Sequence, residues 1–167
     1  MKSKTPYYVF NRQLLQKQYE KMVDLFEQCE VHYALKANAD SKILQILHEC
    51  GSKFEAASVG EFHQLTKLGV SPGRIIYGLP IKPEEMIWQI YRDGCHYFVF
   101  DDMMELEKLN RLAPDAKKVL RIYVCDIVED CFAYGMKWEE IQRNLAHTSC
   151  FRGSIGGLSF HISHNRT

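Results

Sequence analysis

The fold of this chain is decided by residues 31–58, which read VHYALKANADSKILQILHECGSKFEAAS. Two short apolar stretches in it, at 31–37 and 53–58, predict buried strands. Between them, residues 41–50 place isoleucine and leucine on one helical face, and Gly51 follows as a C-terminal cap. A strand, a helix and a second strand in this order predict one parallel βα unit.

The same unit recurs along the rest of the chain. Further strands are predicted near 74–79, 97–101, 118–124 and 156–162. Further helices are predicted at 61–68, 83–94, 103–112 and 138–145, and a short strand at 7–10 with a long helix at 12–28 precedes the first unit. Right-handed crossovers between such units form either an open doubly wound sheet or a barrel. The first strand is not followed by a GxGxxG motif, which favours the barrel over a dinucleotide-binding sheet.

A TIM-type (β/α) barrel has eight strands and typically about 250 residues. This chain has 167 residues and six predicted barrel strands. We therefore expect an α/β fold, a partial barrel with about six of the eight parallel strands. Residues 1–30 would form the N-terminal strand and helix, and residues 31–167 the incomplete barrel.

Composition excludes several classes of protein. The chain has 21 acidic and 21 basic side chains and a formal net charge of zero, which gives no basis for binding nucleic acid or an anionic membrane. Its apolar runs are of strand length, well below the roughly 20 residues of a membrane span, and its start has no secretory signal pattern. We expect a soluble, cytoplasmic protein without nucleic acid or membrane partners.

Four ionisable side chains lie in or at the ends of predicted strands, where a barrel collects its functional groups. Lys36 ends the first strand, Glu55 lies in the second, Arg121 lies in the fifth and His161 ends the sixth. Placing a lysine at the end of a buried strand costs free energy, because burial disfavours the charged ammonium form. Burial therefore lowers the pKa of the amine, and the neutral amine is a nucleophile. Such a lysine most often forms a Schiff base with a carbonyl compound such as pyridoxal phosphate.

Each of these four residues also has a structural alternative. Lys36 can extend from the strand end into water, Glu55 and Arg121 can form an ion pair, and His161 can be a hydrogen-bonded core residue. A metal site is not expected, because the six cysteines form no CxxC pair and the close pair His161 and His164 has no further ligand nearby.

Several motifs in the chain resemble, in the same order, the N-terminal half of ornithine and diaminopimelate decarboxylases. These are pyridoxal-phosphate-dependent enzymes with the alanine-racemase fold, also called fold type III. The motifs are YALKAN at 33–38, FEAASVGE at 54–61, RIIYGLPIK at 74–82, FD at 100–101, LRI at 120–122 and GLSFH at 157–161.

The resemblance implies roles for individual residues. Lys36 would bind pyridoxal phosphate as an internal aldimine, and His161 would stack on its pyridine ring. Glu55 and Arg121 would line the cofactor pocket, and Ala34 would lie on its wall. A further carboxylate nearby, Glu61, would be supporting and not catalytic.

The resemblance also implies a function. We expect a lyase that decarboxylates a basic amino acid such as ornithine, lysine or diaminopimelate, acts in polyamine biosynthesis and forms a homodimer in its full-length form. In the family, a glycine-rich phosphate loop, an acidic partner of the pyridinium nitrogen and a β-domain follow the part that resembles this chain. We therefore expect an N-terminal fragment that is inactive alone and prone to associate.

Two other functions stay open at this point. One is a decarboxylase-like protein without catalysis that binds or regulates a partner. The other is a barrel that carries pyridoxal phosphate for racemisation or for homeostasis of the cofactor.

Overall fold

The computed structural model of the chain describes residues 9–124, 134–147, 151 and 154–161. Its six strands form one parallel sheet in the order β1-β2-β3-β4-β5-β6. Their bounds are His32–Ala34 (β1), Lys53–Ala56 (β2), Ile75–Tyr77 (β3), Tyr97–Phe100 (β4), Lys117–Arg121 (β5) and Ile155–Ser159 (β6). Each strand pairs with the next one along the chain, as in a barrel wall, whereas a doubly wound sheet reverses its strand order. The predicted partial barrel is confirmed.

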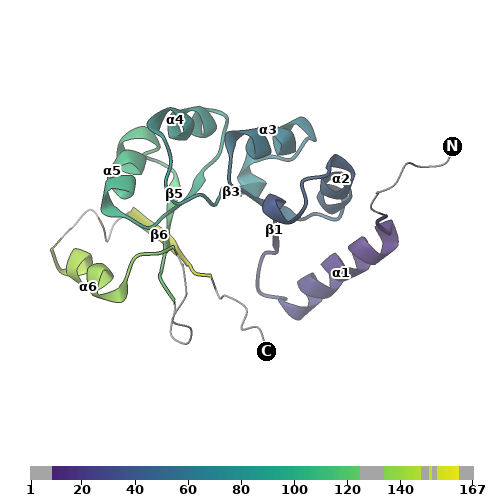
Figure 1. The fold of residues 1–167 in the computed structure, drawn as a ribbon, viewed down its shortest axis with the longest axis horizontal. Coiled ribbons are helices and arrows are strands. Elements are labelled where there is room, and N and C mark those ends of the chain that lie inside the picture. The colour runs from purple at the N-terminus through teal and green to yellow at the C-terminus, as the bar shows by residue number, and fades with distance from the viewer. Residues whose placement is uncertain (1–8, 125–133, 148–150, 152–153, 162–167) are drawn as a thin grey trace.

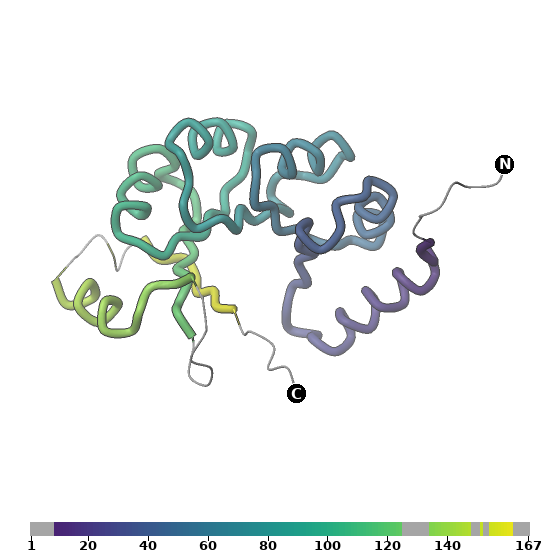
Figure 2. The backbone as a smooth tube through the Cα atoms, viewed as in Figure 1, coloured from purple at the N-terminus to yellow at the C-terminus, as the bar shows by residue number. Residues whose placement is uncertain are grey.

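Helices alternate with these strands. They are α1 (Arg12–Leu25), α2 (Ser41–Glu49), α3 (Val59–Lys67), α4 (Glu84–Arg92), α5 (Met103–Leu112) and α6 (Trp138–His147), with 3-10 helices η1 (Leu35–Ala37) and η2 (Pro72–Arg74). Figure 1 shows α2, α3, α4 and α5 side by side along the outer side of the sheet. Figure 2 shows the same path as an arc that runs from α2 round to β6, with α1 beyond its N-terminal end. None of the helices among the described residues is long and apolar enough to cross a membrane.

The first crossover helix, α2, shows how local sequence sets an element. Asp40 caps it by accepting a hydrogen bond from the backbone N–H of Lys42, at 2.9 Å. Its apolar stripe is buried, with Leu44 fully inaccessible to solvent. Gly51 ends the helix at a φ of 88°, a conformation that glycine adopts without strain.

The main core lies between the sheet and these helices. Strand residues that point to the helices are buried, among them Phe54, Tyr77, Phe98 and Leu120. Because side chains alternate along a strand, the neighbours of these residues point to the other face of the sheet. Glu55 and Arg121 are therefore placed on the inner face, the face that a barrel encloses.

The strands are shorter than the sequence predicts, and this moves two candidate residues out of strands. The first ends at Ala34, so Lys36 lies in the 3-10 helix η1, and the sixth ends at Ser159, two residues before His161. The predicted strand at 7–10 is not found at Val9 and Phe10, which have no regular structure, while residues 7 and 8 lie outside the described part.

Candidate functional site

Lys36 lies in the turn that follows β1, and three contacts set the shape of that turn. Leu35 is buried beside it with 1% of its surface exposed, which turns Lys36 to the opposite, exposed side. The hydroxyl of Tyr33 donates to the carbonyl of Asn38 at 3.0 Å and so closes the turn. From α3, the side-chain amide of Gln64 donates to the carbonyl of Ala39 at 2.7 Å.

The expectation that Lys36 is a buried lysine is wrong for this chain, because Lys36 is exposed. Two other lysines are buried, Lys82 with 1% and Lys118 with 4% of the surface exposed. Lys36 is therefore accessible to a ligand.

Glu55 lies in β2 and its carboxylate crosses to the next strand. A Cβ atom added to Gly78, which follows β3, would lie 2.8 Å from Cδ of Glu55, closer than non-bonded carbon atoms approach. The backbone N–H of Gly78 donates to the carbonyl of Ala56 at 2.8 Å and holds the two strands together at this point. Glycine at 78 therefore makes room for the Glu55 carboxylate.

Arg121 ends β5 and is left with an unused donor. Its Nε atom is buried and has no hydrogen-bond partner among the described residues. Its guanidinium lies 5.8 Å from the ring centroid of Tyr134, within the range of a cation–π contact. Glu55 and Arg121 form no ion pair in the described part of the chain, so the structural alternative for them is not observed.

Tyr134 is held near Arg121 by the two residues that follow it. The N–H of Met136 donates to the carbonyl of Arg121 at 2.8 Å, and its carbonyl accepts from Tyr123 at 3.0 Å. Gly135 has a φ of 138°, and a Cβ atom there would overlap the backbone of Ile122 and Tyr123. The 134–136 segment thus lies against the end of β5 with no space for a side chain at 135.

His161 follows β6, whose Ser159 pairs with Arg121 of β5. The carbonyl of Ser159 accepts a hydrogen bond from the N–H of Ile122 at 2.7 Å and ties the two strand ends together. His161 is exposed, so the alternative of a core histidine is excluded. His164, its proposed pair, lies outside the described residues, and no group of three metal-binding side chains occurs among those that are described.

A cavity of about 400 Å³ brings the four candidate residues together. It opens at the carboxyl ends of the strands, and its lining contains an amine, a carboxylate, a guanidinium and an imidazole. Ala34, which the family resemblance placed on the wall, is not one of the lining residues. The lining consists of Lys36, Glu55, Ala57, Gly78, Leu79, Pro80, Ile81, Arg121, Tyr134 and His161.

Glu61 lies outside this cavity and serves the fold. Its N–H donates to Oγ of Ser58 at 3.1 Å, and its own Oε2 accepts from the N–H of Ala57 at 2.7 Å. These bonds cap the N-terminus of α3, as expected for a serine followed three residues later by a glutamate. The supporting role predicted for Glu61 remains a prediction with respect to any ligand.

Asp101 is a further polar group at this end of the sheet that sequence reasoning did not select. Burial raises the pKa of its carboxyl, while a hydrogen bond from the backbone of Gly135 and the charge of Arg121 act in the opposite direction. An aspartate directly after a buried strand is the signal that marks it, since β4 ends at Phe100.

The chain matches the family described as pyridoxal-dependent decarboxylase, pyridoxal binding domain, over residues 12–166. Ornithine decarboxylase of Neurospora crassa is 33% identical over 133 residues, which are 78% of this chain and 28% of the relative. Antizyme inhibitor 2 of Xenopus laevis is 32% identical over 133 residues, 78% of this chain and 29% of the relative.

Solved structures agree with the sequence comparison. Lysine decarboxylase from Selenomonas ruminantium superposes with a TM-score of 0.83 and 29% identity, covering 95% of this chain and 42% of that one. The chain thus spans less than a third of the length of these two relatives and less than half of this structure.

Proposed function

Because this chain belongs to the pyridoxal-dependent decarboxylase family through its pyridoxal binding domain, we propose that it is the cofactor-binding part of a decarboxylase of basic amino acids. Members of the family are pyridoxal-phosphate-dependent lyases. The observation that carries the proposal is the single cavity that gathers Lys36, Glu55, Arg121 and His161 from four separate segments.

The residues present fit pyridoxal phosphate. The cavity of about 400 Å³ lies within the size range of small-molecule sites. The buried Nε of Arg121 has no partner among the described residues and offers a donor to an anionic oxygen. Because Gly78 has no side chain, the carboxylate of Glu55 has room on the cavity side.

Each residue has a role that follows from its chemistry. The exposed amine of Lys36 would hold the cofactor aldehyde covalently, and the imidazole of His161 would lie against one face of the ring. Glu55 supplies acceptor oxygens and Arg121 supplies donors that orient the polar edge of the group. When bound, pyridoxal phosphate supplies the electron sink that delocalises the electron pair left as carbon dioxide departs.

The substrate class proposed is a basic amino acid. The named relatives include an ornithine decarboxylase and a lysine decarboxylase, which both supports this class and leaves the side-chain length open. A role in polyamine biosynthesis follows if ornithine is the substrate. The homodimer expected from the family resemblance stays a prediction, as does the lack of activity of these 167 residues alone.

The test uses the purified chain and pyridoxal phosphate. We expect an absorbance band near the edge of the visible range, and after borohydride reduction a pyridoxyl label on Lys36 in peptide maps. Lys42, an exposed lysine in α2, provides a matched control, because Lys42→Ala should keep the label and Lys36→Ala should lose it. A label on Lys42 or Lys82 in the unaltered chain would contradict the assignment.

A non-catalytic regulatory protein is the second candidate, favoured by the similarity to antizyme inhibitor 2 over the same share of the chain. The same experiment separates the two. A folded chain, judged by circular dichroism, that acquires neither the absorbance band nor a label on Lys36 would favour the regulatory protein.

A further inference from the structure

Lys82 is a buried lysine with an unusual set of partners. None of its side-chain surface is exposed, and its Nζ atom forms an ion pair with Oε1 of Glu105 at 2.9 Å. The same Nζ donates to three backbone carbonyls, those of Leu79 at 2.9 Å, Pro80 at 2.8 Å and Val99 at 2.6 Å. Lys82 therefore joins the segment after β3 to strand β4 and helix α5.

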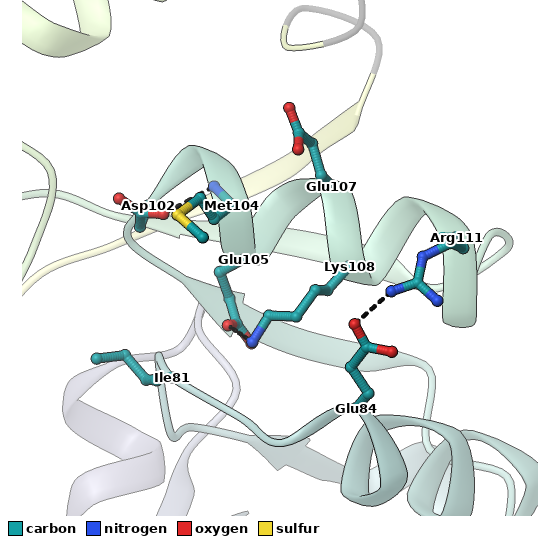
Figure 3. Close-up of a pocket in the computed structure, with 8 residues that line it drawn as sticks. All are labelled: Ile81, Glu84, Asp102, Met104, Glu105, Glu107, Lys108 and Arg111. Carbon is teal, nitrogen blue, oxygen red and sulfur yellow. Dashed lines mark hydrogen bonds and ion pairs between the residues drawn. The ribbon is translucent and has the colours of Figure 1, made fainter.

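Helix α5 also binds the main chain of Lys82. Oε1 of Glu105 accepts from the N–H of Lys82 at 3.1 Å, and the amine of Lys108 donates to the carbonyl of Lys82 at 2.6 Å. Lys108 and Glu105 are themselves paired at 2.5 Å. Figure 3 shows the carboxylate of Glu105 directed to the amine of Lys108.

The segment held in this way is a wall of the candidate site. Gly78, Leu79, Pro80 and Ile81 line the cavity of about 400 Å³. Ile81 also lines a second, larger cavity of about 820 Å³ beside α5, whose lining residues are drawn in Figure 3. Ile81 thus borders both cavities, and the 78–81 segment contains no helix or strand whose own hydrogen bonds would set its shape.

On this basis we propose that Lys82 is a positioning residue: its buried amine, held by Glu105, sets the backbone of Leu79–Ile81 and thereby the wall of the cofactor cavity. This rests on the proposed function, in which that cavity takes pyridoxal phosphate.

The residue type fits this role. Buried carbonyls need donors, and the ammonium group carries three N–H donors that can reach carbonyls in different directions. A buried ion pair by itself contributes little to stability, since an apolar pair of similar volume often packs as well. Replacing both charges together therefore removes the cost of an uncompensated buried charge and leaves only the loss of the hydrogen bonds that they make.

The experiment compares three variants of the full chain with the unaltered protein. Lys82→Met removes the donors and leaves Glu105 uncompensated, whereas the double variant Lys82→Met/Glu105→Leu removes both charges. The control is Glu84→Gln/Arg111→Met, which breaks an exposed ion pair between α4 and α5 that is drawn in Figure 3. Urea unfolding, hydrogen exchange of the 78–82 peptide and the dissociation constant for pyridoxal phosphate are measured for each.

For the double variant, we expect a urea midpoint below that of the unaltered chain, because the carbonyls of Leu79, Pro80 and Val99 lose their donor. The midpoint should stay above that of Lys82→Met, which also leaves Glu105 uncompensated. We also expect faster exchange at 78–82 and a dissociation constant about tenfold higher, as for other supporting residues of a site. The control should match the unaltered chain in exchange and binding. If Lys82→Met does not fold, the double variant still tests whether Lys82 sets the wall of the cavity.

If the double variant does not fold either, Lys108→Met decides. It removes the bond to the Lys82 carbonyl and the ion pair with Glu105, leaves the amine of Lys82 in place, and should raise exchange at 78–82. Unchanged exchange and binding in folded variants would overturn the proposal. Absence of pyridoxal phosphate binding in the unaltered chain would overturn the proposed function, and hydrogen exchange alone would then decide whether Lys82 sets this wall.

Discussion

Tyr77 is a buried tyrosine whose hydroxyl is unsatisfied within the part of the chain that the structure describes. Its side chain is fully buried, its ring packs on Phe98 with 6.1 Å between centroids, and its hydroxyl has no hydrogen-bond partner among the described residues. Burial, with smaller contributions from Glu61 and Cys95, raises the pKa of Tyr77 to about 12. A phenylalanine would keep the packing without the unsatisfied hydroxyl.

We predict that Tyr77→Phe raises the free energy of unfolding by about 1 kcal/mol at pH 7, because leaving a buried polar group unpaired costs about 1–3 kcal/mol. Between pH 10 and about 12, the unfolded chain loses the Tyr77 proton while the folded chain keeps it, so the unaltered protein loses stability as pH rises through this window. The gain of the variant over the unaltered chain should therefore grow in that window. Urea unfolding across the pH range measures both effects, and a variant less stable than the unaltered chain would show that the hydroxyl is paired.

At the scale of elements, short segments that follow the strands position residues of the candidate site. Residues 134–136 lie against the end of β5, where a bridge joins Ile122 to Met136. This places Tyr134 over Arg121. The strand predictions at 118–124 and 31–37 ran past the ends of β5 and β1, because apolar residues that continue a strand pattern also pack well in turns, as buried Leu35 does in η1.

Substitution Gly135→Ala tests how this segment is held. A Cβ atom at 135 would overlap backbone atoms, which cannot move aside as a flexible side chain can, and the φ of 138° adds strain. We predict that the variant stays folded, loses more than about 1 kcal/mol of stability and binds pyridoxal phosphate more weakly.

Gly60→Ala is the matched control for that substitution. Gly60 lies in α3, and the nearest atom to an added Cβ is Oγ of Ser58 at 3.8 Å. This variant should be as stable as the unaltered chain or slightly more so, because alanine favours a helix. Equal binding of pyridoxal phosphate by both glycine variants would contradict a role for the 134–136 segment.

At the scale of the whole molecule, the sheet has two open edges. Strands β1 and β6 each pair on one side only among the described strands. Leu158 of β6 is 63% exposed, and Leu14 and Leu25 of α1 are 56% and 64% exposed. Unpaired strand edges and exposed apolar side chains favour association between chains.

We predict that the isolated chain sediments as dimers or larger species at micromolar concentration. Leu158→Lys should shift it toward the monomer, because a charged side chain on an edge strand opposes pairing with another edge. Trp88→Lys is the control, since Trp88 is a similarly exposed apolar residue on α4, away from both edges. A monomer in the unaltered chain, or an equal effect of both substitutions, would show that the edges do not drive association.

The sequence by itself determined the order of the βα units and pointed to the candidate residues of the site. Both depend on local patterns, because apolar periodicity and caps act within a few residues, and a barrel sends the ends of its strands to one side. Lys36, Glu55, Arg121 and His161 were therefore predicted from the sequence as candidates, and in the structure they line one cavity.

Only the tertiary structure decided which lysine is buried and what forms the wall of the site. Lys82 donates to the carbonyl of Val99, 17 residues away, and its N–H binds Glu105, 23 residues away. Such contacts join segments that are far apart in the sequence, and no periodic pattern in the sequence predicts which of these segments meet. Burial is set by what packs around a residue and not by its neighbours in the chain, which is why exposed Lys36 and buried Lys82 could not be told apart until the elements were in place.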